Sequence, residues 1–144
     1  MIKLRTEVER VPLRQPLSCR EGILLLGSCF TDHIGQWLAE SWLPVRCNPW
    51  GVLFNPASIA LSLSRIIART EGAEAQPFAL TELDGRYYSF LHHGTHSGPD
   101  AAALQAHLRE LDDEVCRFWL KARHVLVTFG TAWVYEREGA VVAN

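Results

Sequence analysis

Short apolar runs and longer amphipathic stretches alternate along this sequence. Residues 23–26 are an uninterrupted apolar run that ends at Gly27, which is typical of a strand buried on both faces of a sheet. Residues 45–47 and 125–129 are two further strand candidates. Between these runs, apolar residues recur at intervals of three and four, the spacing of an amphipathic helix. This order of elements predicts an α/β fold with a mainly parallel sheet.

Helix boundaries are indicated by residues that start or stop a helix. The first helix is predicted to begin near Thr31 and to end before Pro44. The second is predicted to start at Asn55-Pro56, because Asn is a favoured N-cap and Pro a favoured first helical residue. The third is predicted over residues 100–123. The side chains expected to be buried in the first two helices are Ile34, Trp37, Leu38 and Trp42, and Ile59, Leu63, Ile66 and Ile67.

The remaining segments carry weaker patterns. Residues 1–22 are a polar lead-in that we expect to be extended over the core. Residues 72–99 are rich in Gly, Pro and isolated polar residues, with one predicted strand at residues 87–91. Near the end of the chain, two short apolar pairs flank Glu138-Gly139, which predicts a hairpin.

Composition narrows the functional classes. The 144 residues are 48% apolar and 21% charged, and the net charge of −2 offers no basic surface for nucleic acid or an anionic membrane. No apolar stretch approaches the roughly 20 residues of a membrane helix, and no signal peptide is recognisable, so we expect a cytoplasmic protein. The four cysteines lack C-x-x-C or disulfide-framework spacing, so we expect reduced thiols. The acidic run at residues 112–114 is interpreted as a solvated face.

Small and polar residues follow each predicted strand. In open α/β sheets, ligands bind at the carboxyl ends of the strands, where such segments converge. Gly27 permits a tight turn that places Ser28 and Cys29 at a helix N-terminus, where unpaired N–H groups lower a thiol pKa and can hydrogen-bond an oxyanion. Both residues are candidate nucleophiles; alternatively, Ser28 caps the helix and Cys29 is a small buried residue. The segments expected to converge are residues 27–32, 48–51 and 130–133.

Several short motifs occur in order from about residue 20 to the end of the chain. They are Leu26-Gly27-Ser28-Cys29-Phe30, Ile34-Gly35, Asn48-Pro49-x-Gly51, Asn55-Pro56, Ser89-Phe90-Leu91-His92-His93, Thr128-Phe129-Gly130-Thr131-Ala132 and Val142-Ala143-Asn144. Together they resemble the GSCFA domain family, whose fold assignment groups it with the SGNH (GDSL-type) esterases and lipases. The resemblance implies a three-layer α/β sandwich with a mainly parallel sheet, SGNH-hydrolase-like or flavodoxin-like.

The resemblance also implies roles for particular residues. In SGNH hydrolases, a Gly-Asp-Ser block supplies the nucleophile; aligned over residues 27–29, it places the nucleophile at Cys29 and the Asp position at Ser28. A second block supplies a glycine N–H to the oxyanion, and Gly51 is its match. The third block, Gly-x-Asn-Asp, supplies an Asn side-chain donor, but Ala132 stands at that position.

The departure at Ala132 affects the expected chemistry. Loss of one oxyanion donor typically costs about 10²–10³ in rate, unless another group such as Thr131 or Asn48 substitutes. The Asp-x-x-His pair that completes an SGNH site is absent from the residues after Gly130. The resemblance therefore places the catalytic base outside this chain.

Two histidines and one tryptophan are further candidates for the site. His92 or His93 could serve as base or contact a substrate, and the alternative for both is a structural or surface role. With His96 they form no convincing zinc set, because no nearby cysteine or carboxylate completes it, and we expect no metal and no other cofactor. Trp50, beside Gly51, either lines a substrate pocket or packs in the core. The tryptophans predicted only to pack are Trp37, Trp42, Trp119 and Trp133.

We expect a hydrolase or acyl transferase that acts on a small-molecule, carbohydrate or lipid ester, without nucleic acid or membrane as partner. The alternative is a non-catalytic SGNH-like ligand-binding domain or an inactive fragment, which Ala132 and the Ser28-Cys29 pair favour. Residues 1–22 would be a lead-in and residues 23–144 the N-terminal portion of one domain. Only three parallel strands can be counted, whereas a doubly wound sheet usually has about five or more. We therefore expect the natural chain to be longer. The oligomeric state stays open.

Overall fold

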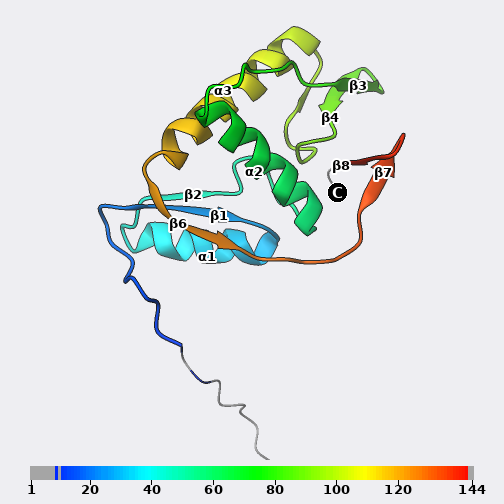
Figure 1. The fold of residues 1–144 in the computed structure, drawn as a ribbon. Helices are drawn as coiled ribbons and strands as arrows, with labels where there is room; N and C mark the ends of the chain where they lie inside the picture. Colours follow the sequence, from blue (N-terminus) through cyan, green and yellow to red (C-terminus); the bar gives the residue numbers. More distant parts are fainter. Residues whose placement is uncertain (1–8, 10, 143–144) are drawn as a thin grey trace, which may run out of the picture.

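The computed structural model describes residue 9 and residues 11–142, and its centre is a parallel sheet (Figure 1). The strands of this sheet are β1 (Gly22–Leu26), β2 (Val45–Cys47) and β6 (Ala122–Val127), in the order β2-β1-β6. Because β1 is the middle strand, Leu24 pairs with Arg46 on one side and with Val125 on the other. The predicted parallel sheet is confirmed, with its last strand at residues 122–127 rather than 125–129.

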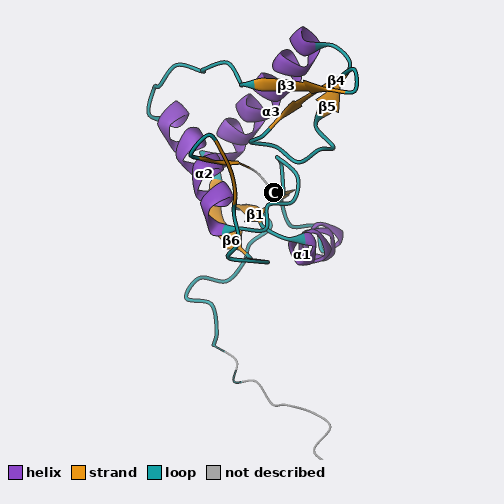
Figure 2. Ribbon diagram, turned by 90° about the vertical axis from the view of Figure 1, so that its right-hand side faces the viewer, coloured by secondary structure: helices purple, strands orange, loops and turns teal. Residues whose placement is uncertain are grey.

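Helices cover both faces of this sheet, because successive residues of β1 point to opposite sides. The helices are α1 (Cys29–Glu40), α2 (Pro56–Thr70) and α3 (Ala101–Trp119). Ile23 and Leu25 pack in a cluster with residues of α1, whereas Leu24 and Leu26 pack with residues of α2 and α3. Figure 2 shows α1 and α2 on opposite sides of β1 and β6. The mixed α/β class is therefore confirmed, and the finer SGNH-type assignment stays a prediction.

Side-chain caps fix the starts of two helices. Asn55 Oδ1 accepts the Ser58 N–H at 2.8 Å, and Asp100 Oδ1 accepts the Ala103 N–H at 2.7 Å. The second helix therefore starts where the Asn-Pro pair predicts. The third helix is shorter than predicted, because the chain from residue 122 onward already pairs with β1.

Tight turns generate two smaller antiparallel sheets. The first contains β3 (Leu80–Leu83), β4 (Arg86–Ser89) and β5 (Ser97–Gly98), and the second contains β7 (Tyr135–Arg137) and β8 (Ala140–Val142). Asp84-Gly85 and Glu138-Gly139 form the turns, and all four residues have positive φ, as type I′ hairpin turns require. The second hairpin is confirmed. The first sheet exceeds the single strand predicted at residues 87–91, because the sequence of β3 has little strand character.

Three tryptophans predicted to pack inside the protein are exposed instead. They are Trp37, Trp42 and Trp133, with exposed fractions of 64%, 90% and 85%. α1 meets the sheet through Gly35, where a Cβ atom would lie 2.6 Å from the Cys47 sulfur. Because α1 approaches the sheet closely at Gly35, only a narrow face of the helix is buried, and Trp37 lies outside that face. Trp119, by contrast, is partly buried against the core, as predicted.

The run at residues 125–129 is also less buried than predicted. Val125, Val127 and Phe129 are exposed, because β6 is an edge strand of the described sheet and residue 129 lies beyond its end. In α2, Ile67 is exposed, whereas Ile66 is fully buried. A hydrophobic run shows that a strand is present, but it does not distinguish a central strand from an edge strand.

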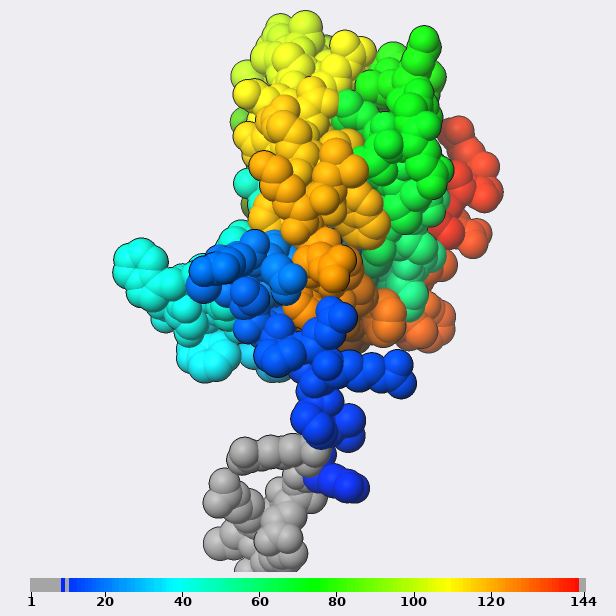
Figure 3. Space-filling model, turned by 60° about the vertical axis from the view of Figure 1, so that its left-hand side comes forward, coloured from blue at the N-terminus to red at the C-terminus, as the bar shows by residue number. Residues whose placement is uncertain are grey.

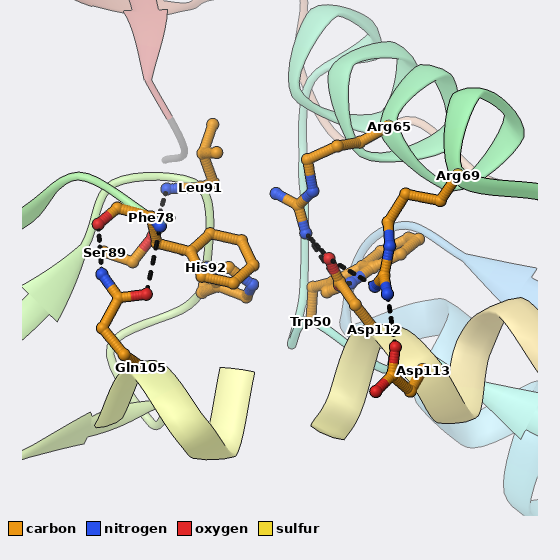
Figure 4. Close-up of polar contacts among 10 residues, drawn as sticks. All are labelled: Trp50, Arg65, Arg69, Phe78, Ser89, Leu91, His92, Gln105, Asp112 and Asp113. Atoms are coloured by element: carbon orange, nitrogen blue, oxygen red, sulfur yellow. Dashed lines mark hydrogen bonds and ion pairs between the residues drawn. The ribbon is translucent and has the colours of Figure 1, made fainter. Parts of the chain in front are cut away.

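A buried carboxylate joins α3, α2 and the loop after β2. Asp112 is only 2% exposed, and its Oδ1 accepts the indole N–H of Trp50 at 3.0 Å (Figure 4). Nη2 of Arg65 lies 2.7 Å from each carboxylate oxygen, and Nη1 of Arg69 lies 3.6 Å from Oδ2. The interpretation of residues 112–114 as a solvated face is therefore wrong for Asp112, which has two cationic partners from a neighbouring helix.

Replacing Asp112 by Asn should lower the free energy of unfolding by about 3 kcal/mol, because two half-buried arginines lose their shared anion. Asp113→Asn is the matched control: its carboxylate is about half exposed and pairs with Arg69, so the expected loss is below about 1 kcal/mol. Urea unfolding followed by circular dichroism measures both values. Equal losses for the two variants would contradict a special role for Asp112.

Candidate functional site

The three segments that follow the parallel strands meet at one end of the sheet, as predicted. The Gly27 N–H donates to Asn48 Oδ1 at 2.8 Å, which joins the ends of β1 and β2. The Thr128 N–H donates to the Leu26 carbonyl at 3.0 Å, which joins the ends of β1 and β6. A Cβ atom on Gly130 would lie 3.4 Å from the Ser28 Cβ, so the third segment also reaches the turn after β1.

Gly27 makes the turn between β1 and α1 possible. Its φ is +145°, and a Cβ atom at this position would lie 2.2 Å from the Thr128 carbonyl oxygen and 2.8 Å from the Thr31 hydroxyl. No side chain fits in that space, so the position requires glycine. The chain therefore passes directly from the buried strand into the first turn of α1.

Ser28 and Cys29 occupy different environments in this turn. Ser28 is the N-cap residue of α1, is 9% exposed and makes no side-chain capping bond; its hydroxyl lies 3.4 Å from that of Thr128. Cys29 is the first residue of α1, and it is exposed. The alternative interpretation of Cys29 as a small buried residue is therefore wrong.

The Asn48 side chain hydrogen-bonds to the turn between β1 and α1. Its Oδ1 accepts the Gly27 N–H, and its Nδ2 donates to Asp32 Oδ1 at 2.6 Å. Asn48 itself has a φ of +39°, a backbone conformation in which Asn is enriched. Its amide thus fixes the end of β2 to both the turn after β1 and the first turn of α1.

The predicted oxyanion donor Gly51 closes a turn with Asn48. Its N–H donates to the Asn48 carbonyl at 2.8 Å, and its φ is +81°. A Cβ atom on Gly51 would lie 2.2 Å from the Cβ of His93, so the histidine packs directly on the glycine. The neighbouring Trp50 is 1% exposed and donates to Asp112, which places its side chain in the core.

Thr131 is held by the loop that precedes α2. The N–H groups of Gly130 and Thr131 donate to the Phe54 carbonyl at 2.8 and 3.1 Å, and the Thr131 hydroxyl oxygen accepts the Trp133 N–H at 3.1 Å. Because its oxygen is already an acceptor, the Thr131 hydroxyl can still donate its hydrogen to a ligand. Ala132, which the sequence comparison above places where a side-chain donor would be expected, is exposed.

His93 lies in an open cleft of about 570 Å³ with Asp32, Asn48 and Gly51. Its backbone N–H donates to the Trp50 carbonyl at 2.9 Å, and its Nδ1 accepts the Thr95 N–H at 3.3 Å. A ring nitrogen that accepts a hydrogen bond carries no proton, so the neutral His93 ring has its proton on Nε2. Neutral His93 is therefore a hydrogen-bond donor at Nε2.

His92 belongs to the core instead of the cleft. It is 4% exposed, its Nδ1 lies 2.9 Å from the Ser89 hydroxyl, and its ring packs edge-on against Phe78 (Figure 4). Burial and, to a smaller extent, the positive charge of Arg65 together lower the pKa of His92 to about 3. His92 is thus neutral at ordinary pH.

The remaining histidines and cysteines form no metal site among residues 11–142. His96 Nδ1 lies 3.1 Å from His107 Nε2, and their rings are stacked. All four cysteines are free thiols. Burial raises the pKa of Cys47 to about 12, and the negative charge of Asp32 acts in the same direction, so Cys47 stays a thiol that donates weakly to the Thr31 carbonyl.

Three contributors to this site were not singled out by sequence reasoning: Thr31, Asp32 and Thr128. The Thr128 hydroxyl contacts both Ser28 and the Thr31 hydroxyl, and Asp32 accepts from Asn48. All three lie in the segments or motifs that follow the predicted strands, so a signal was present. It was incomplete because the pairing of these hydroxyls depends on the parallel register of β1 and β6.

The fold and the site define a mixed α/β protein with a polar cleft at the carboxyl ends of its parallel strands. The model of the GSCFA family matches residues 22–144, so the chain belongs to the GSCFA family. Comparisons with curated proteins and with solved structures gave no match. None of the helices in the described ranges is long and apolar enough to cross a membrane.

The state of His92 predicts how stability depends on pH. In the unfolded chain, His92 binds a proton when the pH falls below its ordinary pKa of 6.5. In the folded protein, it binds a proton only when the pH falls to about 3. The free energy of unfolding should therefore fall as the pH decreases from 6.5 toward 4, with a contribution from His92 of up to about 1.4 kcal/mol per pH unit.

His92→Phe should make this pH dependence shallower, because the substituted ring cannot titrate. Urea unfolding at several pH values measures the slope for the wild type and the variant. His33→Gln is the control, since His33 is exposed on α1 and its loss should leave the slope unchanged. An unchanged slope in His92→Phe would show that other groups cause the pH dependence.

Proposed function

We propose that this chain carries an acyl-transfer site in which Cys29 attacks the carbonyl carbon of an ester. The observation that most directly supports this proposal is that Cys29 is both exposed and the first residue of α1. The first N–H groups of a helix have no intrahelical partner, and the helix dipole favours negative charge at this end. These groups would stabilise an oxyanion formed next to the Cys29 sulfur.

Ser28 is the weaker candidate for the nucleophile. It is nearly buried, and its hydroxyl faces the hydroxyl of Thr128 at 3.4 Å. Within the described ranges, neither Ser28 nor Cys29 is hydrogen-bonded to a histidine. A serine hydroxyl depends on such a base, whereas a thiol is intrinsically the better nucleophile near neutral pH. This difference favours Cys29.

A polar cleft is lined by Asp32, one helical turn after Cys29, and favours a substrate with hydrogen-bonding groups. Asp32 follows Cys29 by one helical turn, so both side chains lie on the same side of α1. Asp32 lines the cleft with Asn48 and His93, and the cleft volume of about 570 Å³ lies within the usual range for small-ligand sites. We therefore propose that the substrate is an ester whose alcohol part is a small polar molecule or a carbohydrate. Its acyl part could come from a lipid.

The proposed reaction has two acyl-transfer steps. The Cys29 sulfur bonds to the carbonyl carbon, the alcohol leaves with a proton, and an acyl thioester remains on the enzyme. Water then releases the acid in a hydrolase, or a second alcohol takes the acyl group in a transferase. In this proposal Gly51 shares its N–H between Asn48 and the oxyanion, and the Thr131 hydroxyl donates in place of the missing Asn side chain.

Cys29→Ala should reduce the turnover of p-nitrophenyl acetate by the purified full-length protein to the uncatalysed background. The release of p-nitrophenol measures the rate. Cys19→Ala is the matched control, because Cys19 is also an exposed thiol but lies before β1. Iodoacetamide should inactivate the wild type and Cys19→Ala alike.

Ser28→Ala separates the two candidate nucleophiles. If Cys29 is the nucleophile, this variant keeps measurable turnover, because only a neighbouring hydroxyl is lost. Equal turnover by the wild type, Cys29→Ala and Ser28→Ala would refute a nucleophile in this turn. Loss of turnover in Ser28→Ala with full activity in Cys29→Ala would assign the role to Ser28.

A further inference from the structure

A second cavity lies between α2, α3 and the segment of residues 73–79, and its volume is about 430 Å³. In Figure 1, this segment follows the C-terminal end of α2 and passes over α3 to reach β3. Figure 3 shows α2 in green and α3 in yellow to orange, side by side on one face of the molecule. No residue of the turn at residues 27–29 lines this cavity, so it is separate from the acyl-transfer site proposed above.

The cavity has a mostly apolar lining. Four alanines from α2 and the segment contribute to it, together with Pro77, Phe78 and Leu91. Phe78 is nearly buried and is fixed by Gln105, whose Oε1 accepts the Phe78 N–H at 3.1 Å. Small-molecule sites typically combine such an apolar wall with a few polar groups, at volumes of about 300–1,000 Å³. The cavity has the size and the lining of a ligand site.

Cationic side chains dominate the polar part of the lining. Arg65 and Arg69 reach it from α2, and Arg109 reaches it from α3. The buried Asp112 is shared by Arg65 and Arg69, and Asp113 pairs with Arg69 (Figure 4). These contacts balance the two arginines of α2.

Arg109 is the third arginine of the lining. It makes no ion pair among residues 11–142, and it is exposed on α3 one helical turn before Asp112. The remaining acidic residue of the lining is Glu74, which is exposed in the segment of residues 73–79 and makes no ion pair among residues 11–142. A ligand anion would therefore meet Arg109 as an attractive group and Glu74 as a repulsive one.

Arg65 contributes an unsatisfied donor at the same place. Its Nε is buried and has no hydrogen-bond partner within the described residues, although its terminal nitrogens bind Asp112. The guanidinium group lies 4.6 Å from the centre of the Phe78 ring, over its face. A buried donor without a partner is unfavourable, and the cation–π contact with the Phe78 ring offsets part of this cost.

We propose that this cavity binds a small amphipathic carboxylate. The apolar part of the ligand would pack against the alanines and Phe78, and its carboxylate would pair with the arginines, chiefly with Arg109. A guanidinium group matches a carboxylate through two parallel hydrogen bonds, which neither an alcohol nor an amine can reproduce. The proposal is independent of the chemistry at Cys29 and holds whether or not the chain hydrolyses esters.

Isothermal titration calorimetry of the full-length protein with octanoate tests this proposal, with octanol and octylammonium as probes of equal chain length. Octanoate should bind, octanol should bind about tenfold more weakly, because it lacks the charge-assisted hydrogen bonds, and octylammonium should not bind. Arg109→Gln should weaken octanoate binding by about tenfold. Glu74→Gln should strengthen it, because the repulsive charge is removed.

Two further variants fix the location of the site. Arg117→Gln removes an arginine that is exposed on the same helix but outside the cavity, and it should bind octanoate like the wild type. Ala68→Leu fills part of the cavity from α2 and should weaken both octanoate and octanol. The proposal is overturned if octanoate does not bind, if octanol binds equally well, or if Arg109→Gln and Arg117→Gln behave alike.

Discussion

One buried carboxylate connects parts of this fold that are far apart in sequence. Asp112 lies on α3, and its partners Trp50, Arg65 and Arg69 come from the loop after β2 and from α2. An anion removed from water is strongly unfavourable unless it is hydrogen-bonded and paired. All three contacts therefore require both helices and the loop to be in place together. This requirement makes the packing of α2 against α3 specific rather than merely hydrophobic.

The same carboxylate is connected to the candidate site through Trp50. The indole ring of Trp50 packs with Leu24 and Leu26 of β1, while its carbonyl accepts the His93 N–H. Gly51 then packs on His93, and Asn48 holds Gly27. Contacts thus run without interruption from the buried anion to the turn that carries Cys29. The polar cleft is shaped by the same interactions that hold the core together.

Local sequence signals predicted the elements of this fold better than they predicted which individual side chains are buried. The run at residues 23–26, the Asn55-Pro56 start and the Glu138-Gly139 turn depend on neighbouring residues, and each was correctly predicted. Burial depends on partners distant in sequence. From the sequence, Asp112 belongs to an acidic surface run, but in the structure two arginines of α2 pair with it. The helical spacing predicts that Trp37 is buried, but α1 packs on the sheet through Gly35 and leaves Trp37 exposed. For the site, the convergence of the strand ends was predictable; the hydrogen bonds that occupy Asn48 and Gly51 were not.

Those occupied groups limit what chemistry this site can support. The N–H groups of Gly51, Gly130 and Thr131 and the amide of Asn48 all bind other parts of the chain. A serine mechanism needs a base and several free donors, and this turn provides few of them. A thiol at a helix N-terminus depends less on a base and on other donors, because the sulfur is a good nucleophile and the first N–H groups of the helix are donors. For the proposed acyl transfer, the exposed Cys29 therefore suits the role of nucleophile better than the nearly buried Ser28 does.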